Sequence, residues 1–118
     1  MIDHFTVSVK DLAASRAFYE KVLAPLGYGV KMEFQQYLGF GDKKPYLWLK
    51  QAEVGTTPQH IAFRAHSRAA VDGFHQAAIA AGAKDDGSPG IREMYHPHYY
   101  GAFVIDPDGH NIEAVFHG

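Results

Sequence analysis

The spacing between apolar residues changes several times along the chain, and each change marks the start of another expected helix or strand. Residues 4–9, HFTVSV, alternate in polarity and contain β-branched side chains, which predicts a strand. The next stretch, 12–24, follows a capping Asp11 and carries apolar residues at helical spacing until Pro25 and Gly27. Three further strands are expected after this helix, at about 28–34, 36–41 and 45–51.

The same order of elements then begins again. Residues 59–65, QHIAFRA, have the pattern of a strand, and residues 68–81 carry an apolar stripe at helical spacing. Strand-like pieces follow near 91–95, 100–105 and 110–116. The two halves align at a shift of 56 residues, which places His4 on His60. The sequence therefore predicts an internal repeat of the form βαβββ followed by βαβββ.

Length and composition narrow the possible classes of protein. The 118 residues are expected to form a single domain, 1–118, with a first module of about 1–55 and a second of about 56–118. A net charge of −2 without a clustered basic face argues against nucleic-acid binding. No apolar run has membrane-spanning length, and no signal peptide is evident. The absence of cysteine excludes disulfides and thiolate sites, so a cytoplasmic protein is expected.

Strand alternation places three polar side chains on the sheet faces that point away from the helices. These are His4 in the first strand, His60 in the fifth and Glu113 in the last. They could be ordinary solvent-exposed residues of half-exposed sheets. However, the same face carries large aromatic groups such as Trp48 and Tyr46, and the two histidines are related by the repeat. Two imidazoles and one carboxylate are also a known ligand set for a divalent metal.

Three stretches resemble the vicinal oxygen chelate superfamily, which includes glyoxalase I, bleomycin resistance proteins and extradiol dioxygenases. They are IDHFTVSVKDLAASRAFYEKVLAPLGY, TPQHIAF and YYGAFVIDPDGHNIEAV. The resemblance implies an α+β fold of paired βαβββ modules, in which eight strands form a cup with the helices outside. It also implies an active site in the concave face, with His4, His60 and Glu113 as the metal ligands.

The resemblance departs from the family pattern in the fourth strand. Glyoxalase I has a second carboxylate there, which acts as its base, whereas alignment of PYLWLK with HNIEAV places Trp48 at that position. Trp48 is therefore expected to wall the pocket beside the ion, and the remaining metal positions would be open to water or substrate. A set of two histidines and one glutamate also occurs in the fosfomycin-resistance and extradiol-dioxygenase branches, although a dioxygenase usually has four modules.

A second cluster, REMYHPHYYG at residues 92–101, is dense in histidine and tyrosine. His96, His98, Tyr99 and Tyr100 could line the mouth of the cup and, together with Arg92, bind an anionic or carbonyl-bearing substrate, with Trp48 as an aromatic wall. An aromatic loop that fills a gap or makes a dimer contact fits the pattern equally well. The other histidines are expected on the surface: His66, His75, His110 and His117.

These features favour a metal-dependent glyoxalase-like enzyme of the lyase, isomerase or transferase type. Its divalent ion (Mn, Fe, Ni, Co or Zn) would act as a Lewis acid that stabilises an oxyanion or enolate of a small oxygen-chelating substrate. The main alternative is a metal-free binding protein of the bleomycin-resistance type. A ring-cleaving dioxygenase and an interaction protein with an empty cup are less favoured by the pattern. Uncovered strand edges predict a homodimer. The pattern leaves open whether the cup closes within one chain or between two.

Overall fold

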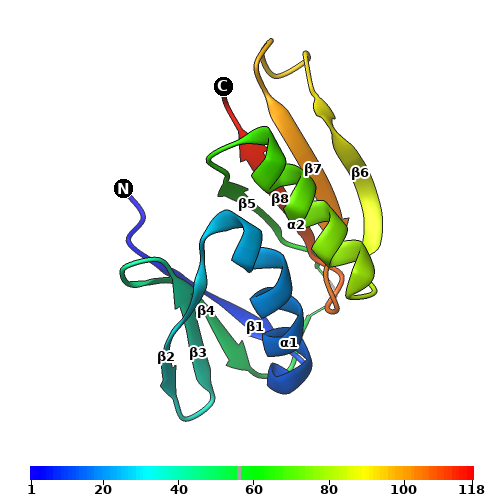
Figure 1. Ribbon diagram of the computed structural model, residues 1–118. Coiled ribbons are helices and arrows are strands. Elements are labelled where there is room, and N and C mark those ends of the chain that lie inside the picture. Colours follow the sequence, from blue (N-terminus) through cyan, green and yellow to red (C-terminus); the bar gives the residue numbers. More distant parts are fainter. Residues whose placement is uncertain (56) are drawn as a thin grey trace.

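The computed structural model describes residues 1–55 and 57–118 and confirms the predicted α+β fold of two βαβββ modules (Figure 1). The first module comprises β1 (Phe5–Val9), α1 (Leu12–Leu23), a short 3₁₀ helix η1 (Ala24–Leu26), β2 (Gly29–Phe34), β3 (Tyr37–Gly41) and β4 (Pro45–Gln51). The second comprises β5 (His60–Arg64), α2 (Arg68–Ala80), β6 (Lys84–Ile91), β7 (Tyr100–Ile105) and β8 (Asn111–Phe116).

Each module forms its own four-stranded mixed sheet. The strand orders are β1-β4-β3-β2 and β5-β8-β7-β6. In both sheets the first strand of the module pairs in parallel with the last, and the remaining pairs are antiparallel. The equal topology of the two sheets confirms the repeat that the sequence predicted.

Local sequence signals explain where the helices begin and end. The Asp11 carboxylate accepts a hydrogen bond from the Ala14 amide at the start of α1, and the Ser67 hydroxyl does the same for Ala70 at the start of α2. The first helical segment ends at Gly27, whose φ of 86° is readily adopted only by glycine. Neither helix in the described residues is long and apolar enough to cross a membrane.

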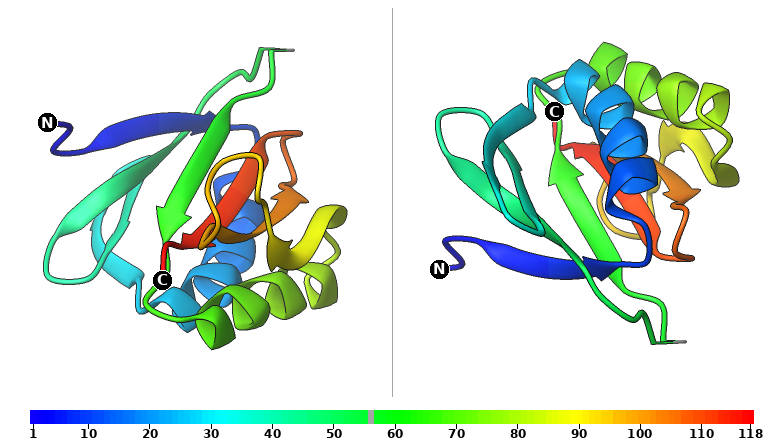
Figure 2. Two further views of the ribbon diagram at one scale, coloured as in Figure 1. Left: turned by 90° about the horizontal axis from the view of Figure 1, so that it is seen from above. Right: turned by 90° about the horizontal axis from the view of Figure 1, so that it is seen from below.

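The two helices pack against each other and against one face of the sheets, so the modules share a single core (Figure 2). The fully buried side chains alternate along the strands and repeat along the helices, as the apolar pattern predicted. They include Val9, Tyr19, Val22, Leu49, Val71, Phe74, Val104 and Ile112. The opposite faces of both sheets therefore remain available for a site.

The prediction for the sixth strand was wrong, because β6 covers Lys84–Ile91 and the expected range of 91–95 lies almost entirely in turns. The β6 sequence KDDGSPGI is rich in residues that are depleted in strands. β6 is an edge strand with shifts in register, and such a strand tolerates these residues. Pro89, for example, lacks an N–H, and a strand at the edge of a sheet can hold a residue that donates no ladder hydrogen bond. Neighbouring strands therefore override local propensity in β6.

A buried hydrogen-bond network joins the two modules. The Asp106 carboxylate, in the turn between β7 and β8, accepts the amides of Asp108 and His110 at 2.9 and 2.8 Å. Its other oxygen accepts the hydroxyl of Tyr19 from α1 at 2.6 Å. Burial and the nearby Asp106 carboxylate raise the pKa of Tyr19, so this hydroxyl stays protonated and donates. His110 is 4% exposed and accepts the Gln59 amide, so its expected surface position was wrong.

We expect Tyr19→Phe to lower the free energy of unfolding by about 1.5–3 kcal/mol, because it leaves a buried carboxylate oxygen without a donor. Urea unfolding followed by circular dichroism measures this change. Tyr28→Phe is the matched control, since the Tyr28 hydroxyl makes only a 3.5 Å contact with the Arg64 carbonyl, and it should change stability by less than about 0.5 kcal/mol. Equal effects of the two changes would show that the Asp106 network does not stabilise the module contact.

Candidate functional site

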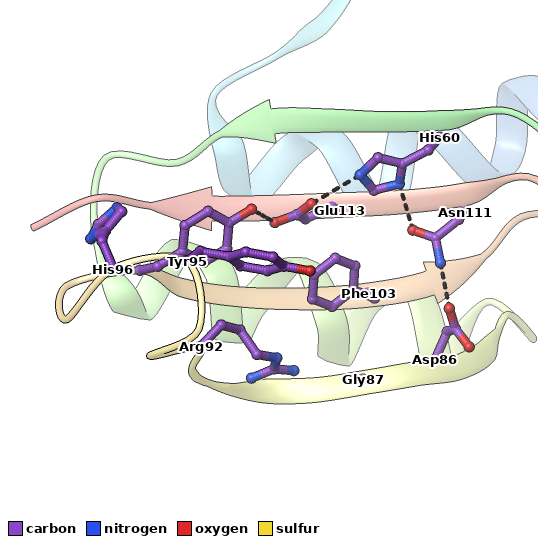
Figure 3. Close-up of a pocket in the computed structure, with 10 residues that line it drawn as sticks. His60, Asp86, Gly87, Arg92, Tyr95, His96, Phe103, Asn111 and Glu113 are labelled. Atoms are coloured by element: carbon purple, nitrogen blue, oxygen red, sulfur yellow. Dashed lines mark hydrogen bonds and ion pairs between the residues drawn. The ribbon is translucent and has the colours of Figure 1, made fainter.

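A pocket of about 780 Å³ opens on the face of the second sheet that points away from the helices (Figure 3). All four strands of this sheet contribute to it: His60 from β5, Asp86 from β6, Phe103 from β7 and Glu113 from β8. The turn at 92–99 supplies its rim. The pocket therefore lies on the face that strand alternation marked as polar.

His60 and Glu113 meet at the base of this pocket. The Nε2 atom of His60 lies 3.1 Å from Oε1 of Glu113. The two residues lie on adjacent parallel strands. Ala62 is the direct partner of Glu113, and His60 lies two residues before Ala62 on the same face of β5. The Glu113 side chain is 3% exposed, whereas that of His60 is 53% exposed. The arrangement thus combines a buried carboxylate with an accessible imidazole.

Tyr99 holds the second oxygen of Glu113. Its hydroxyl donates a short hydrogen bond to Oε2, and burial together with this bond raises the pKa of Tyr99, so the hydroxyl remains a donor. Gly101 lies beneath the contact, where a Cβ atom would come within 3.1 Å of the Tyr99 ring and 3.3 Å of Oε2. Glycine at this position therefore leaves room for the pair. The sequence had placed Tyr99 at the mouth of the cup, and the structure brings it into this pocket.

The His60 ring is held from two sides. Its Nδ1 atom lies 2.7 Å from Oδ1 of Asn111, the residue directly opposite it in the ladder. The Phe103 ring stacks on the imidazole with 6.2 Å between centroids and 25° between planes. The amide nitrogen of Asn111 in turn donates to the Asp86 carboxylate (Figure 3). Asn111 and Asp86 were not among the predicted site residues.

His4, the third predicted ligand, lies just before β1 and does not line this pocket. Its side chain is 55% exposed, and Nδ1 is 2.7 Å from a carboxylate oxygen of Asp3. Within residues 1–55 and 57–118, no three histidine, aspartate or glutamate side chains lie close enough together to hold a metal ion. One chain therefore brings together two of the three predicted ligands.

Besides Tyr99, two further predicted substrate residues, Arg92 and His96, line the pocket (Figure 3). The Arg92 guanidinium lies over the Phe103 ring, 5.4 Å from its centroid, and donates to the Ser88 carbonyl at 2.8 Å. His96 Nε2 lies 2.9 Å from Nδ1 of His117. Arg92 therefore keeps further N–H donors for a ligand, whereas both ring nitrogens of His96 are engaged, one by His117 and one by the His98 amide.

The other predicted substrate residues lie outside this lining. Trp48 is in β4 of the first sheet, packed over Gly39. The Tyr100 hydroxyl donates to Asp72 of α2 at 2.7 Å, so this side chain is on the helix-covered face. His98 lies beside the C-terminal residue and donates its amide to His96. In this loop the structure therefore brings Tyr99, and not Tyr100, to the pocket.

Comparison with known proteins agrees with this fold. The family model described as Glyoxalase/Bleomycin resistance protein/Dioxygenase superfamily matches residues 1–114. A solved glyoxalase/bleomycin resistance protein from Albidiferax ferrireducens is 28% identical over 96% of this chain and 96% of that one, with a TM-score of 0.83. No curated protein gives a significant match.

Two more distant structures share the fold. A lactoylglutathione lyase from Agrobacterium tumefaciens is 20% identical over 98% of this chain and 92% of that one, with a TM-score of 0.72. Another is a mutant of the fosfomycin resistance protein FosX from Listeria monocytogenes, complexed with Mn(II) and a dihydroxypropylphosphonic acid. It is 19% identical over 96% of this chain and 86% of that one, with a TM-score of 0.73. The family match spans nearly the whole chain, and the protein belongs to the glyoxalase/bleomycin resistance protein/dioxygenase superfamily.

Proposed function

We propose that the protein is a divalent-metal-dependent, glyoxalase-like enzyme in which His60 and Glu113 supply two of the metal ligands. The observation that carries this proposal is the buried carboxylate of Glu113 beside an imidazole nitrogen at 3.1 Å. A carboxylate is costly to bury unless a cation or several donors compensate its charge. Imidazole nitrogen and carboxylate oxygen are both good donors for divalent transition metals, so these residues fit such an ion.

A third ligand, His4, is proposed to come from a second copy of the chain. The residues on the outer face of β1 (His4, Thr6, Ser8) and of β5 (His60, Ala62, Arg64) are all exposed. Since the modules are alike, a two-fold axis between two chains can bring the first-module face of one chain over the second-module face of the other. Such a dimer would contain two equal cups, each with ligands from both chains.

Exposed apolar side chains on the first sheet support the same assembly. Met32, Phe34 and Tyr46 are 50%, 59% and 37% exposed. The ladder places them with Trp48 on the face away from the helices. An apolar face of this kind is uncommon on a monomer and is typical of a surface that another chain covers. In the dimer, Trp48 would wall the cup opposite the Glu113 pocket.

The chain's own residues define what the pocket could do with a substrate. A divalent ion, when bound, supplies a Lewis acid that polarises two oxygen atoms of a small molecule. Tyr99 keeps Glu113 oriented, and the Arg92 guanidinium offers donors to an anionic part of the substrate. The FosX relative, whose structure contains Mn(II) and a phosphonic acid, is consistent with this combination.

Removal of either metal ligand should weaken binding of Mn(II) or Zn(II) by at least about 100-fold while the fold is retained. Loss of a residue that only hydrogen-bonds to a ligand typically weakens metal binding by about 10–100-fold, and loss of the ligand itself should cost more. Isothermal titration of His60→Ala and Glu113→Gln measures the affinity, and circular dichroism checks the fold. His75→Ala is the control, since His75 pairs with Asp85 outside this pocket. A wild-type protein that binds neither ion would overturn the enzyme proposal and favour the metal-free binding protein.

The cross-chain site predicts complementation between two defective chains. A heterodimer of His4→Ala and Glu113→Ala chains, isolated with two different non-histidine tags, should bind about one metal ion with wild-type affinity. One of its cups has all three ligands and the other lacks two of them. Each variant homodimer should bind weakly at both sites. If each cup instead forms within one chain, the heterodimer will bind as weakly as the homodimers.

A further inference from the structure

The strongest unexplained feature of the pocket is the chain of contacts that runs from Asp86 through Asn111 to His60. Asp86 lies on β6 at a register shift, where Asp85 pairs with Val104 and Gly87 pairs with Phe103, so Asp86 is the additional residue of a bulge. Bulges beside functional sites commonly redirect a side chain. Here the carboxylate is directed across the sheet to the Asn111 amide on β8 (Figure 3).

Donor and acceptor chemistry fixes the direction of each contact in this chain. A carboxylate only accepts, so the Asn111 atom that faces Asp86 is the donating Nδ2. The carbonyl Oδ1 of Asn111 then faces Nδ1 of His60 at 2.7 Å. Since a carbonyl oxygen also only accepts, Nδ1 of His60 carries the hydrogen. An inverted Asn111 amide would place its oxygen against the Asp86 carboxylate, where two acceptors repel.

This assignment determines the chemistry of the other ring nitrogen. An imidazole with a single hydrogen, on Nδ1, has its lone pair on Nε2, and this is the form of His60 that can bind a cation through Nε2. That lone pair faces Oε1 of Glu113 at 3.1 Å, and the Tyr99 hydroxyl already donates to the second oxygen of the same carboxylate. In this tautomer two acceptors lie side by side, and a cation bound to both atoms would satisfy them.

We propose that Asp86 and Asn111 are positioning residues that hold His60 in the Nδ1–H tautomer, with its Nε2 lone pair directed into the cation site beside Glu113. This inference rests on the proposed metal-dependent function and adds the residues that prepare the ligand. Phe103 supports the same orientation, because its ring stacks on the imidazole and limits its rotation. Metal-bound histidines commonly require such a partner on the second nitrogen.

The first test reads the tautomer directly in the metal-free protein. Long-range ¹H–¹⁵N spectra of the histidine rings, recorded in alkaline buffer, should show hydrogen on Nδ1 of His60 in the wild type. Asn111→Leu, which removes the acceptor and keeps a similar size, should shift the ring toward the Nε2–H tautomer. A wild-type His60 with hydrogen on Nε2 would overturn the inference.

The second test measures affinity for Zn(II) by isothermal titration. Asn111→Leu and Asp86→Ala should each weaken binding about 10–100-fold. Glu93→Ala is the charge-matched control for Asp86, because Glu93 is an exposed carboxylate of the adjoining turn. The exchange D86N/N111D keeps the net charge and places the carboxylate beside His60 with the amide on β6. It should therefore restore both the tautomer and most of the affinity.

The outcomes separate this inference from the proposed function. If the wild type binds no metal ion, the metal-dependent function fails, and the role assigned to Asp86 and Asn111 fails with it. If the wild type binds the ion and Asn111→Leu retains both tautomer and affinity, only the positioning role is overturned. If D86N/N111D is as weak as the single variants, the loss reflects disruption of the sheet, which also overturns the positioning role.

Discussion

The structure of the pocket depends on one buried charge, the Glu113 carboxylate in the middle of β8. Its side chain is almost inaccessible, yet it lies on the sheet face opposite the hydrophobic core. A charge in such a position must be compensated by neighbours. Tyr99 supplies one donor, Gly101 leaves space for the contact, and His60 stands at the remaining oxygen. The residues that contact Glu113 from β5, from β7 and from the turn before β7 thus accommodate or compensate one buried carboxylate.

The two modules share a topology but differ at the position that holds the carboxylate of the site. Trp48 occupies the position in β4 that matches Glu113 in β8. The first sheet therefore offers His4 and an aromatic wall, whereas the second offers His60 and the carboxylate. Two unlike faces of this kind complement each other, and under the proposed two-fold arrangement each dimer contains two identical cups rather than one cup and one empty face.

The sequence predicted the elements whose local signals agree with their tertiary surroundings. The Asp11 and Ser67 caps fixed the helix starts, and strand alternation correctly placed His60 and Glu113 on the same face. β6 was misplaced because its Gly- and Pro-containing sequence forms a strand only through its pairing with β7. His110 was assigned to the surface because a turn sequence does not reveal that the Tyr19 network encloses it. The separation of His4 from the pocket depends on how the modules pack, which periodicity within each module does not encode.

Anomalous diffraction at the metal absorption edge, from crystals grown with Mn(II) or Zn(II), would show directly whether His60 and Glu113 hold an ion. We expect one strong peak per pocket, about 2.0–2.3 Å from Nε2 of His60 and from a carboxylate oxygen of Glu113. Asn111 should remain on Nδ1 of the same ring. A peak elsewhere, for example between His96 and His117, or coordination of His60 through Nδ1, would contradict this expectation.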